Sequence, residues 1–193
     1  MKAGSNALEV RARQPGFRVA VRADARLAAA YRGERYEFRS GLDAALQVLR
    51  LMVKTDAFLG LVAYRLETRL RQLRVPVLPW LARRVAISSA QISISDAAVV
   101  APGVFIPYGQ VVTYGAVQVE PFVTLFPWVL LGPMTGGVAG PTIRAQATLG
   151  AGAKVIGEVE VGAGARVGTN AVVVNDVPPN TTVVGMPAER VAE

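Results

Sequence analysis

Aliphatic residues recur every six positions through the second half of this sequence, a period that neither a helix nor an alternating strand produces. A first run keeps this spacing, a second continues after one extra residue, and a third follows a Gly- and Pro-rich interruption at residues 132–142. The thirteen sites are Ile94, Val100, Ile106, Val112, Val119, Leu125, Leu131, Ile143, Leu149, Val155, Val161, Val167 and Val173. This repeat constrains the fold more than any other feature of the chain.

A period of six predicts a strand of two or three residues followed by a turn, with one aliphatic side chain per repeat inside a prism. Three repeats close one triangular coil. Small residues stand four positions after many of the aliphatic sites, where the interior is crowded: Ala98, Ala116, Ala147, Ala153, Ala165 and Ala171. The sequence therefore predicts a parallel β-solenoid of about five coils rather than a sandwich, which would show a period of two.

The region before the repeat has helical periodicity. Ser40 followed by Asp43 resembles a capping box, and a second helix is expected after Asp56, ending before Pro76. A short third helix is expected at Pro79–Ala86. The apolar positions of the first two helices are Leu42, Leu46, Leu49 and Val53, then Leu59, Val62, Leu66, Leu70 and Leu73.

We divide the chain into an N-terminal extension (1–39), a helical region (40–87) and a β-helix with a C-terminal cap (88–193). The extension receives no assignment, although Gly16–Asp24 alternates apolar and polar residues as a short strand would. The expected fold class is mainly β, preceded by a small α-helical region.

Composition narrows the possible chemistry. The chain contains no cysteine, so it has no thiolate nucleophile and no disulfide. It also contains no histidine, the side chain that most often acts as general base near neutral pH. We expect no metal site, because the commonest transition-metal ligands are missing. Residues 1–10 lack the apolar core of a signal peptide, and no apolar stretch is long enough to span a bilayer, so we expect a cytoplasmic protein.

Charge is distributed unevenly. Residues 1–85 carry 17 Lys and Arg against 7 Asp and Glu, whereas residues 86–193 carry 4 against 7. An anionic partner would suit the basic part. A solvated helix face explains it better, because the arginines follow amphipathic patterns without interleaved aromatic residues for base stacking. We expect no nucleic-acid partner.

Three segments, residues 92–109, 142–174 and 175–191, resemble the hexapeptide-repeat acyltransferases, and specifically the serine O-acetyltransferases. The likeness extends over about residues 41–191. It implies a left-handed parallel β-helix and a homotrimer, with coenzyme A in the groove between adjacent prisms. Pairing of two trimers through the helical region is a further expectation. It also implies acetyl-CoA, or another acyl-CoA, as co-substrate.

On the cofactor side the family's residues are retained. Its pantetheine-contacting turns correspond to small residues whose backbone the cofactor arm can reach without a Cβ barrier, although such turns also serve simply to close coils. They are Gly150, Ala151, Gly152, Ala153, Lys154, Gly168, Thr169 and Asn170, and a turn that includes Gly185, Met186, Pro187 and Ala188 closes the far end.

On the acceptor side the family's residues are replaced. Its catalytic histidine corresponds to Tyr108 and a second histidine to Gly140. Its serine-binding arginine and aspartate correspond to Ala139 and Ser93. We therefore expect a small-molecule acceptor other than free serine, with a hydroxyl or an amine as nucleophile.

Tyr108 is a poor base, because lowering its phenol pKa from near 10 to about 7 requires roughly 4 kcal/mol of phenolate stabilisation. It is a better hydrogen-bond donor, able to orient an acceptor or polarise a thioester carbonyl. Tyr114, Glu120 and Asp96 are the other polar candidates, with a solvated turn position as the alternative for each. Of these, Tyr114 and Glu120 are taken as candidate catalytic residues.

Three functions fit these observations: an acyl-CoA-dependent transferase, a catalytically silent homologue that acts as scaffold or regulatory subunit, and a repurposed groove with different chemistry. Aromatic residues near the site favour an apolar acceptor pocket and subunit packing equally; they are Phe105, Tyr108, Tyr114, Phe122, Phe126 and Trp128. We expect neighbouring prisms to bury the stretch that holds Phe122, Phe126, Trp128 and Val129. The sequence ends Val191–Ala192–Glu193, without the family's C-terminal isoleucine anchor, so we expect no cysteine synthase complex.

Overall fold

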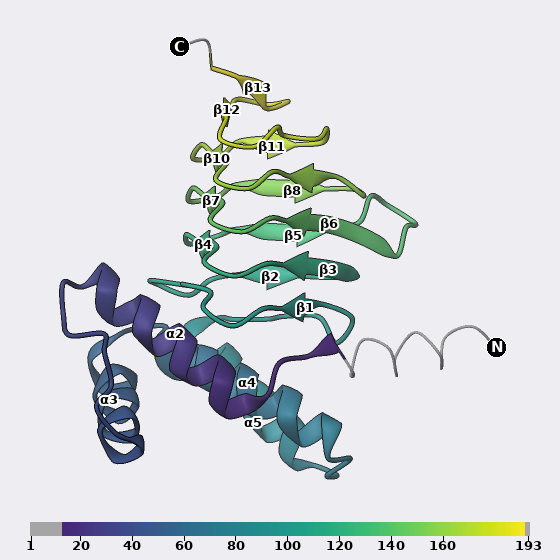
Figure 1. The fold of residues 1–193 in the computed structure, drawn as a ribbon. Coiled ribbons are helices and arrows are strands. Elements are labelled where there is room, and N and C mark those ends of the chain that lie inside the picture. The colour runs from purple at the N-terminus through teal and green to yellow at the C-terminus, as the bar shows by residue number, and fades with distance from the viewer. Residues whose placement is uncertain (1–12, 192–193) are drawn as a thin grey trace.

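The computed structural model describes residues 13–191, in which a layer of four helices supports a three-sided prism of short strands (Figure 1). The helices are α2 (Phe17–Tyr31), α3 (Gly41–Lys54), α4 (Phe58–Gln72) and α5 (Leu78–Ala90). The expectations that concern residues 1–10 and the last two residues, 192–193, lie outside the described residues.

Helix α2 occupies most of the segment Gly16–Asp24, which received no assignment although its alternation of apolar and polar residues resembled a short strand. Over its full length the segment has one helical face of small residues, and arginines at intervening positions reach solvent. A short fragment of such a helix imitates strand alternation. The buried residues are Ala20, Val21, Asp24, Ala25, Ala28 and Ala29.

Helix α3 begins as predicted, because the Ser40 hydroxyl accepts a hydrogen bond from the Asp43 N–H at 3.1 Å. Its apolar series faces away from the rest of the chain, with side chains between 58% and 81% exposed. The exposed residues are Leu42, Leu46, Leu49 and Val53, and those on the buried face are Ala44, Gln47 and Leu51.

Helices α4 and α5 pack against each other beneath the prism (Figure 1). Asp56 does not cap α4, whose N-cap residue is Ala57 and has no side-chain hydrogen bond. At the start of α4 the Phe58 N–H donates instead to the Thr55 carbonyl. Helix α5 is longer than the predicted Pro79–Ala86, and Pro79 stands in its first turn as expected.

The strands form three faces of the prism. Face 1 contains β1, β3, β6 and β9; face 2 contains β4, β7, β10, β12 and β13; face 3 contains β2, β5, β8 and β11. Pairing is parallel except between β12 and β13. The strands are β1 (Val99–Val100), β2 (Val112–Thr113), β3 (Ala116–Val119), β4 (Thr124–Leu125), β5 (Leu130–Gly132), β6 (Ala139–Ile143), β7 (Thr148–Leu149), β8 (Lys154–Ile156), β9 (Glu160–Val161), β10 (Arg166–Val167), β11 (Val172–Val173), β12 (Thr182–Val184) and β13 (Glu189–Arg190).

The predicted aliphatic sites fill the prism interior with one exception. Val112 is 42% exposed, and its neighbour Thr113 points inward instead, where its hydroxyl accepts a hydrogen bond from the Ser95 N–H. The extra residue in the repeat therefore lies before Thr113, one repeat earlier than predicted. Val129, expected on the outer surface, is also interior and 1% exposed.

A buried ion pair joins the helices to the lowest coil. The Arg65 guanidinium of α4 donates to the Asp24 carboxylate of α2, with Nε to Oδ2 at 2.9 Å, and both side chains are at most 3% exposed. Asp24 also accepts hydrogen bonds from the N–H groups of Gly103 and Val104. Arg65 donates to two carbonyls, those of Val100 and Ala101. Every part of the pair is satisfied, so it fixes α2, α4 and the prism together.

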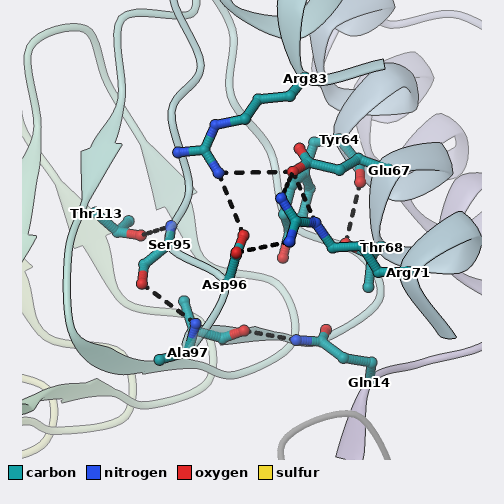
Figure 2. A network of polar contacts seen from close by, with 11 residues as sticks. Gln14, Tyr64, Glu67, Thr68, Arg71, Arg83, Ser95, Asp96, Ala97 and Thr113 are labelled. Carbon is teal, nitrogen blue, oxygen red and sulfur yellow. Dashed lines mark hydrogen bonds and ion pairs between the residues drawn. The ribbon is translucent and has the colours of Figure 1, made fainter. Parts of the chain in front are cut away.

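A second polar network holds α4 and α5 against the first coil (Figure 2). Arg71 contacts both Glu67, at 3.0 Å, and Asp96, at 2.7 Å. Arg83 of α5 reaches Asp96 at 3.2 Å and Glu67 at 3.6 Å. Burial of Glu67 raises the pKa of its carboxyl, against the opposing effect of Arg71.

Candidate active site

Four turns stack on the edge between face 2 and face 3, and we call this the stacked edge. They are Pro107–Gln110, Phe126–Trp128, Gly150–Gly152 and Gly168–Asn170. Backbone hydrogen bonds link each turn to the next, from Trp128 N–H to the Gln110 carbonyl, from Gly152 N–H to the Pro127 carbonyl and from Asn170 N–H to the Ala151 carbonyl. The edge thus brings Tyr108 into one column with the turns expected to bind the cofactor.

The upper half of the stacked edge consists of two turns that contain glycine, Gly150–Gly152 and Gly168–Asn170. A Cβ atom on Gly150 would lie 2.8 Å from the Thr169 nitrogen, so the two turns approach too closely for any side chain. Gly168 is constrained in the same way by a Val184 methyl at 2.7 Å. These glycines are needed to stack the coils. The two turns, which we call the backbone track, also carry the side chains of Ala151, Thr169 and Asn170, and the Asn170 amide lies over Gly152.

The remaining predicted cofactor residues differ in their exposure and hydrogen bonding. Ala153 is fully buried inside the prism, so it offers at most its backbone. Lys154 on β8 is exposed, and its Nζ donates to the Gly152 carbonyl at 2.9 Å. Thr169 and Asn170 are exposed on the edge, and Pro187 is exposed in the turn after β12.

The lower half of the stacked edge contains the extra residue that shifts the six-residue period. Phe105 pairs with Thr124 and Val112 with Leu130, so seven positions separate the pair in the lower coil and six in the coil above. The turn Pro107–Gln110 therefore has four residues where its counterparts have three. This longer turn carries Tyr108, whose side chain is 59% exposed and makes no hydrogen bond to another described residue.

Tyr114 lies on a different edge, between face 3 and face 1. Its ring covers Gly132, because a Cβ atom there would lie 2.2 Å from the ring. Its hydroxyl donates to the Pro133 carbonyl at 3.2 Å, at the start of the loop 133–138 that projects from the prism (Figure 1). Within one chain Tyr114 anchors this loop rather than joining Tyr108.

Glu120 lies on the third edge, between face 1 and face 2. Its carboxylate accepts hydrogen bonds from Arg144 at 2.7 Å and from the Ala145 N–H at 2.9 Å. Arg144 also pairs with Glu160, whose carboxylate pKa it lowers. The three candidate catalytic residues therefore occupy three different edges, and only Tyr108 shares one with the cofactor turns.

Two residues of the stacked edge were not singled out as site residues from the sequence. Trp128, treated there only as one of several nearby aromatics, has a left-handed φ of 64° and is 62% exposed. Gln110 occupies the matching position one coil below, with φ of 59°. The shift of the six-residue period was the available signal, but it was placed one repeat too late to mark this corner.

Among the described residues, no cluster of three or more acidic, cysteine or histidine side chains could hold a metal ion. None of the described helices is long and apolar enough to cross a membrane. The stacked edge is built from backbone, phenol, indole and amide groups.

Comparison with protein-family models gives no match. Among curated proteins, the chain is 34% identical over 148 residues to a serine acetyltransferase of Synechococcus elongatus, covering 75% of this chain and 60% of the relative. It is 36% identical over 140 residues to the serine acetyltransferase of Escherichia coli K12, covering 70% and 51%. The chain thus spans between half and three fifths of the length of these relatives.

Solved structures give a broader match. A soybean serine acetyltransferase apoenzyme is 30% identical, with a TM-score of 0.70 over 92% of this chain and 70% of that one. A Neisseria gonorrhoeae serine acetyltransferase in complex with serine is 26% identical, with a TM-score of 0.72 over 90% and 68%. With the stacked coils, the glycine turns and these likenesses together, the chain belongs to the serine acetyltransferase-like family of hexapeptide-repeat acyltransferases, and its prism is the left-handed β-helix of that family.

Proposed function

We propose that this protein transfers an acyl group, most simply acetyl, from coenzyme A to a small-molecule acceptor. The observation that carries the proposal is the stacked edge, where the glycine turns and an exposed phenol lie in one column. The relatives support acetyl transfer in general, and one solved Brucella abortus serine acetyltransferase is a complex with coenzyme A.

In this proposal the pantetheine arm lies along the upper half of the stacked edge. Backbone N–H and C=O groups of the two glycine turns hold it, and the Asn170 amide adds a donor and an acceptor. Lys154 supplies a positive charge beside the track. The side chains at the turn centres, half-buried Ala151 and exposed Thr169, border the arm without blocking it.

The acceptor oxygen or nitrogen attacks the thioester carbonyl, the carbon–sulfur bond breaks, and the acceptor proton leaves with the thiol. Tyr108 donates a hydrogen bond to the oxyanion that develops on the carbonyl or holds the acceptor in place. It does not need to remove a proton, because an oriented acceptor gains much of its rate from proximity.

We propose an acceptor other than free serine. The relatives and one neighbour point to serine for those proteins, so serine is the necessary reference substrate. The support for a different acceptor is the composition of the lower half of the edge, since the stretches 106–111 and 125–130 contain no charged residue to hold an ammonium and a carboxylate.

We also propose that the groove forms between copies of the chain in a trimer. The support is a set of apolar side chains on face 3 and at its borders, beside the charged Lys154, which stay exposed in the single chain. The residues are Val112, Tyr114, Trp128, Met134 and Val184. A surface of this kind is a typical subunit contact.

The test blocks the track with one bulky residue. Ala151→Trp enlarges the centre of the turn before Gly152, and Ala163→Trp makes the same change before Gly164, at the matching turn position on another edge. We expect acetyl-CoA binding, measured by calorimetry, to be lost only in Ala151→Trp. Equal binding by both variants, or by neither, would contradict the placement of the arm.

A second function, a catalytically silent scaffold, is favoured by one observation: the chain contains no histidine and Tyr108 is a poor base. Free-thiol release from acetyl-CoA separates the two. Release that depends on an added acceptor establishes transfer, whereas tight coenzyme A binding without release for serine, simple amines and hydroxylated acceptors establishes the scaffold.

A further inference from the structure

An open hollow of about 350 Å³ lies in the helical layer, where α4 ends and α5 begins. Two arginines, two valines, a proline and a tryptophan line it: Arg71, Arg74, Val75, Val77, Pro79 and Trp80. No acidic side chain is among them. Small-molecule sites begin at about this volume, so the hollow has room for a ligand of one or two fused rings.

One of the two cations at the hollow is unpaired. Arg71 is held by Glu67 at 3.0 Å and by Asp96 at 2.7 Å, so its charge is balanced (Figure 2). Arg74 makes no hydrogen bond or ion pair with another described residue, and its side chain is exposed. The hollow therefore has one uncompensated positive charge, which favours a ligand with one negative charge.

The rest of the lining is apolar and includes an exposed indole. Trp80 is 58% exposed, and the Arg84 guanidinium lies 5.2 Å from its ring centroid. Arg84 does not line the hollow, so the part of the indole that borders the hollow is open to a second planar group. An aromatic ring suits this surface, because it stacks on an indole and packs against aliphatic side chains.

The loop that forms the hollow is strained. Val77 has φ of 64° and ψ of −49°, and the Leu78 N–H donates to the Pro76 carbonyl at 2.7 Å, which makes a γ-turn of the rare, strained kind. A β-branched residue is an outlier in this conformation, yet the Val77 side chain is 74% exposed, so core packing does not explain it. Arg74 is also left-handed, with φ of 55°. Strain of this kind concentrates at sites that hold ligands.

We infer that this hollow binds an aromatic monocarboxylate, whose ring stacks on Trp80 and whose carboxylate pairs with Arg74. The planar guanidinium matches a carboxylate through two parallel hydrogen bonds. A phosphate dianion would need a second free cation, and Arg71 is already engaged by two carboxylates. The hollow lies outside the stacked edge, so the inference does not depend on acyl transfer.

The experiment measures the binding of benzoate to the full chain by titration calorimetry. Benzamide has the same ring without the charge, and acetate has the charge without the ring. Arg74→Gln removes the unpaired cation, and Arg69→Gln is the matched control, because Arg69 is an exposed arginine of α4 that does not line the hollow. Trp80→Leu removes the indole, whereas Trp80→Phe keeps an aromatic ring.

We expect benzoate to bind at least tenfold more tightly than benzamide or acetate. Its dissociation constant should rise tenfold or more in Arg74→Gln and in Trp80→Leu, stay unchanged in Arg69→Gln, and return toward the wild-type value in Trp80→Phe. The inference is overturned if benzoate does not bind, if benzamide binds equally well, or if the two glutamine variants have equal effects.

Fluorescence locates the ligand independently. The chain has two tryptophans, so Trp128→Phe leaves Trp80 as the sole indole. Adding benzoate to this variant should change the indole emission. Calorimetric binding without such a change would place benzoate elsewhere on the protein and refute the site.

The strained turn provides a further test. Val77→Gly should raise the melting temperature, because glycine adopts positive φ without the steric cost that valine has. The same change should weaken benzoate binding, because it loosens the turn and removes one wall of the hollow. A higher melting temperature with unchanged benzoate affinity would contradict the role that we assign to this turn.

Discussion

At the scale of single residues, the site differs from an ordinary corner of the prism by one inserted position. Tyr108 is exposed because its turn has four residues, and the phenol is free to act since no described residue bonds to it. The sequence identified Tyr108 through the family resemblance, not through its geometry. The same resemblance could not reveal that the Glu120 carboxylate pairs with Arg144, because that contact depends on how successive coils align.

We predict that Tyr108→Phe lowers kcat by about ten- to a thousandfold, through loss of one oriented hydrogen bond in the transition state. The coenzyme A dissociation constant should stay the same. If the ring only packs, Tyr108→Phe will be silent and only Tyr108→Ala will matter, through a lower melting temperature. Tyr108→His should gain at most weak transfer to serine, because Ser93, Ala139 and Gly140 provide no charged contact for it.

A second prediction at this scale concerns Glu67, whose carboxyl pKa is raised by burial. A raised pKa means that the folded state binds the proton more tightly than the unfolded state, so stability is highest below the unfolded value of about 4.3 and falls as pH rises through the folded pKa. We expect the unfolding free energy of wild type relative to Glu67→Gln to decrease from pH 4 to pH 7. A difference that grows over this range would contradict the assignment.

At the scale of elements, the buried Asp24–Arg65 pair sets the position of α2 and α4 under the first coil. No sequence period marks this pair, because one isolated aspartate in α2 and one arginine in α4 carry no repeating signal. The alternation in α2 was equally uninformative. Long-range polar contacts of this kind are recognisable only when the two segments are seen together.

We predict that Asp24→Asn destabilises the protein by about 3–5 kcal/mol, since it leaves the Arg65 charge buried and uncompensated. Chemical denaturation at neutral pH measures this. The control is the partly exposed pair of Arg32 and Glu34, whose side chains are 38% and 21% exposed, and Glu34→Gln should cost less than about 1 kcal/mol. Similar losses in both variants would show that the buried pair has no special role.

At the scale of the whole molecule, the six-residue period predicted the prism, its interior and its approximate height. It misplaced a single register shift, at Val112 and Thr113, because a valine happens to stand beside the true interior threonine. The sequence predicted the helices of the helical region, but not that α3 leaves its apolar face exposed to solvent. The exposed series on α3 has the 4, 3, 4 spacing of a two-stranded helical seam, a pattern that sequence alone could not separate from a buried face.

We expect the protein to assemble as trimers that pair through α3. Leu46→Glu combined with Leu49→Glu should halve the sedimenting mass, from a pair of trimers to one, and leave the melting temperature within a few degrees of wild type. Val19→Glu, also on an exposed helical position, should leave the mass unchanged. A monomer at micromolar concentration would refute the whole assembly.

The four-residue corner has a consequence for how such proteins diversify. Because each coil bonds only to its neighbours, an insertion in one turn is absorbed where it occurs, and the glycine turns further along keep their register. The turn on the proposed acceptor side can therefore change while the glycine turns proposed to bind coenzyme A stay the same. One added residue therefore reshapes a single corner of the prism, while the turns on the coils above keep their geometry.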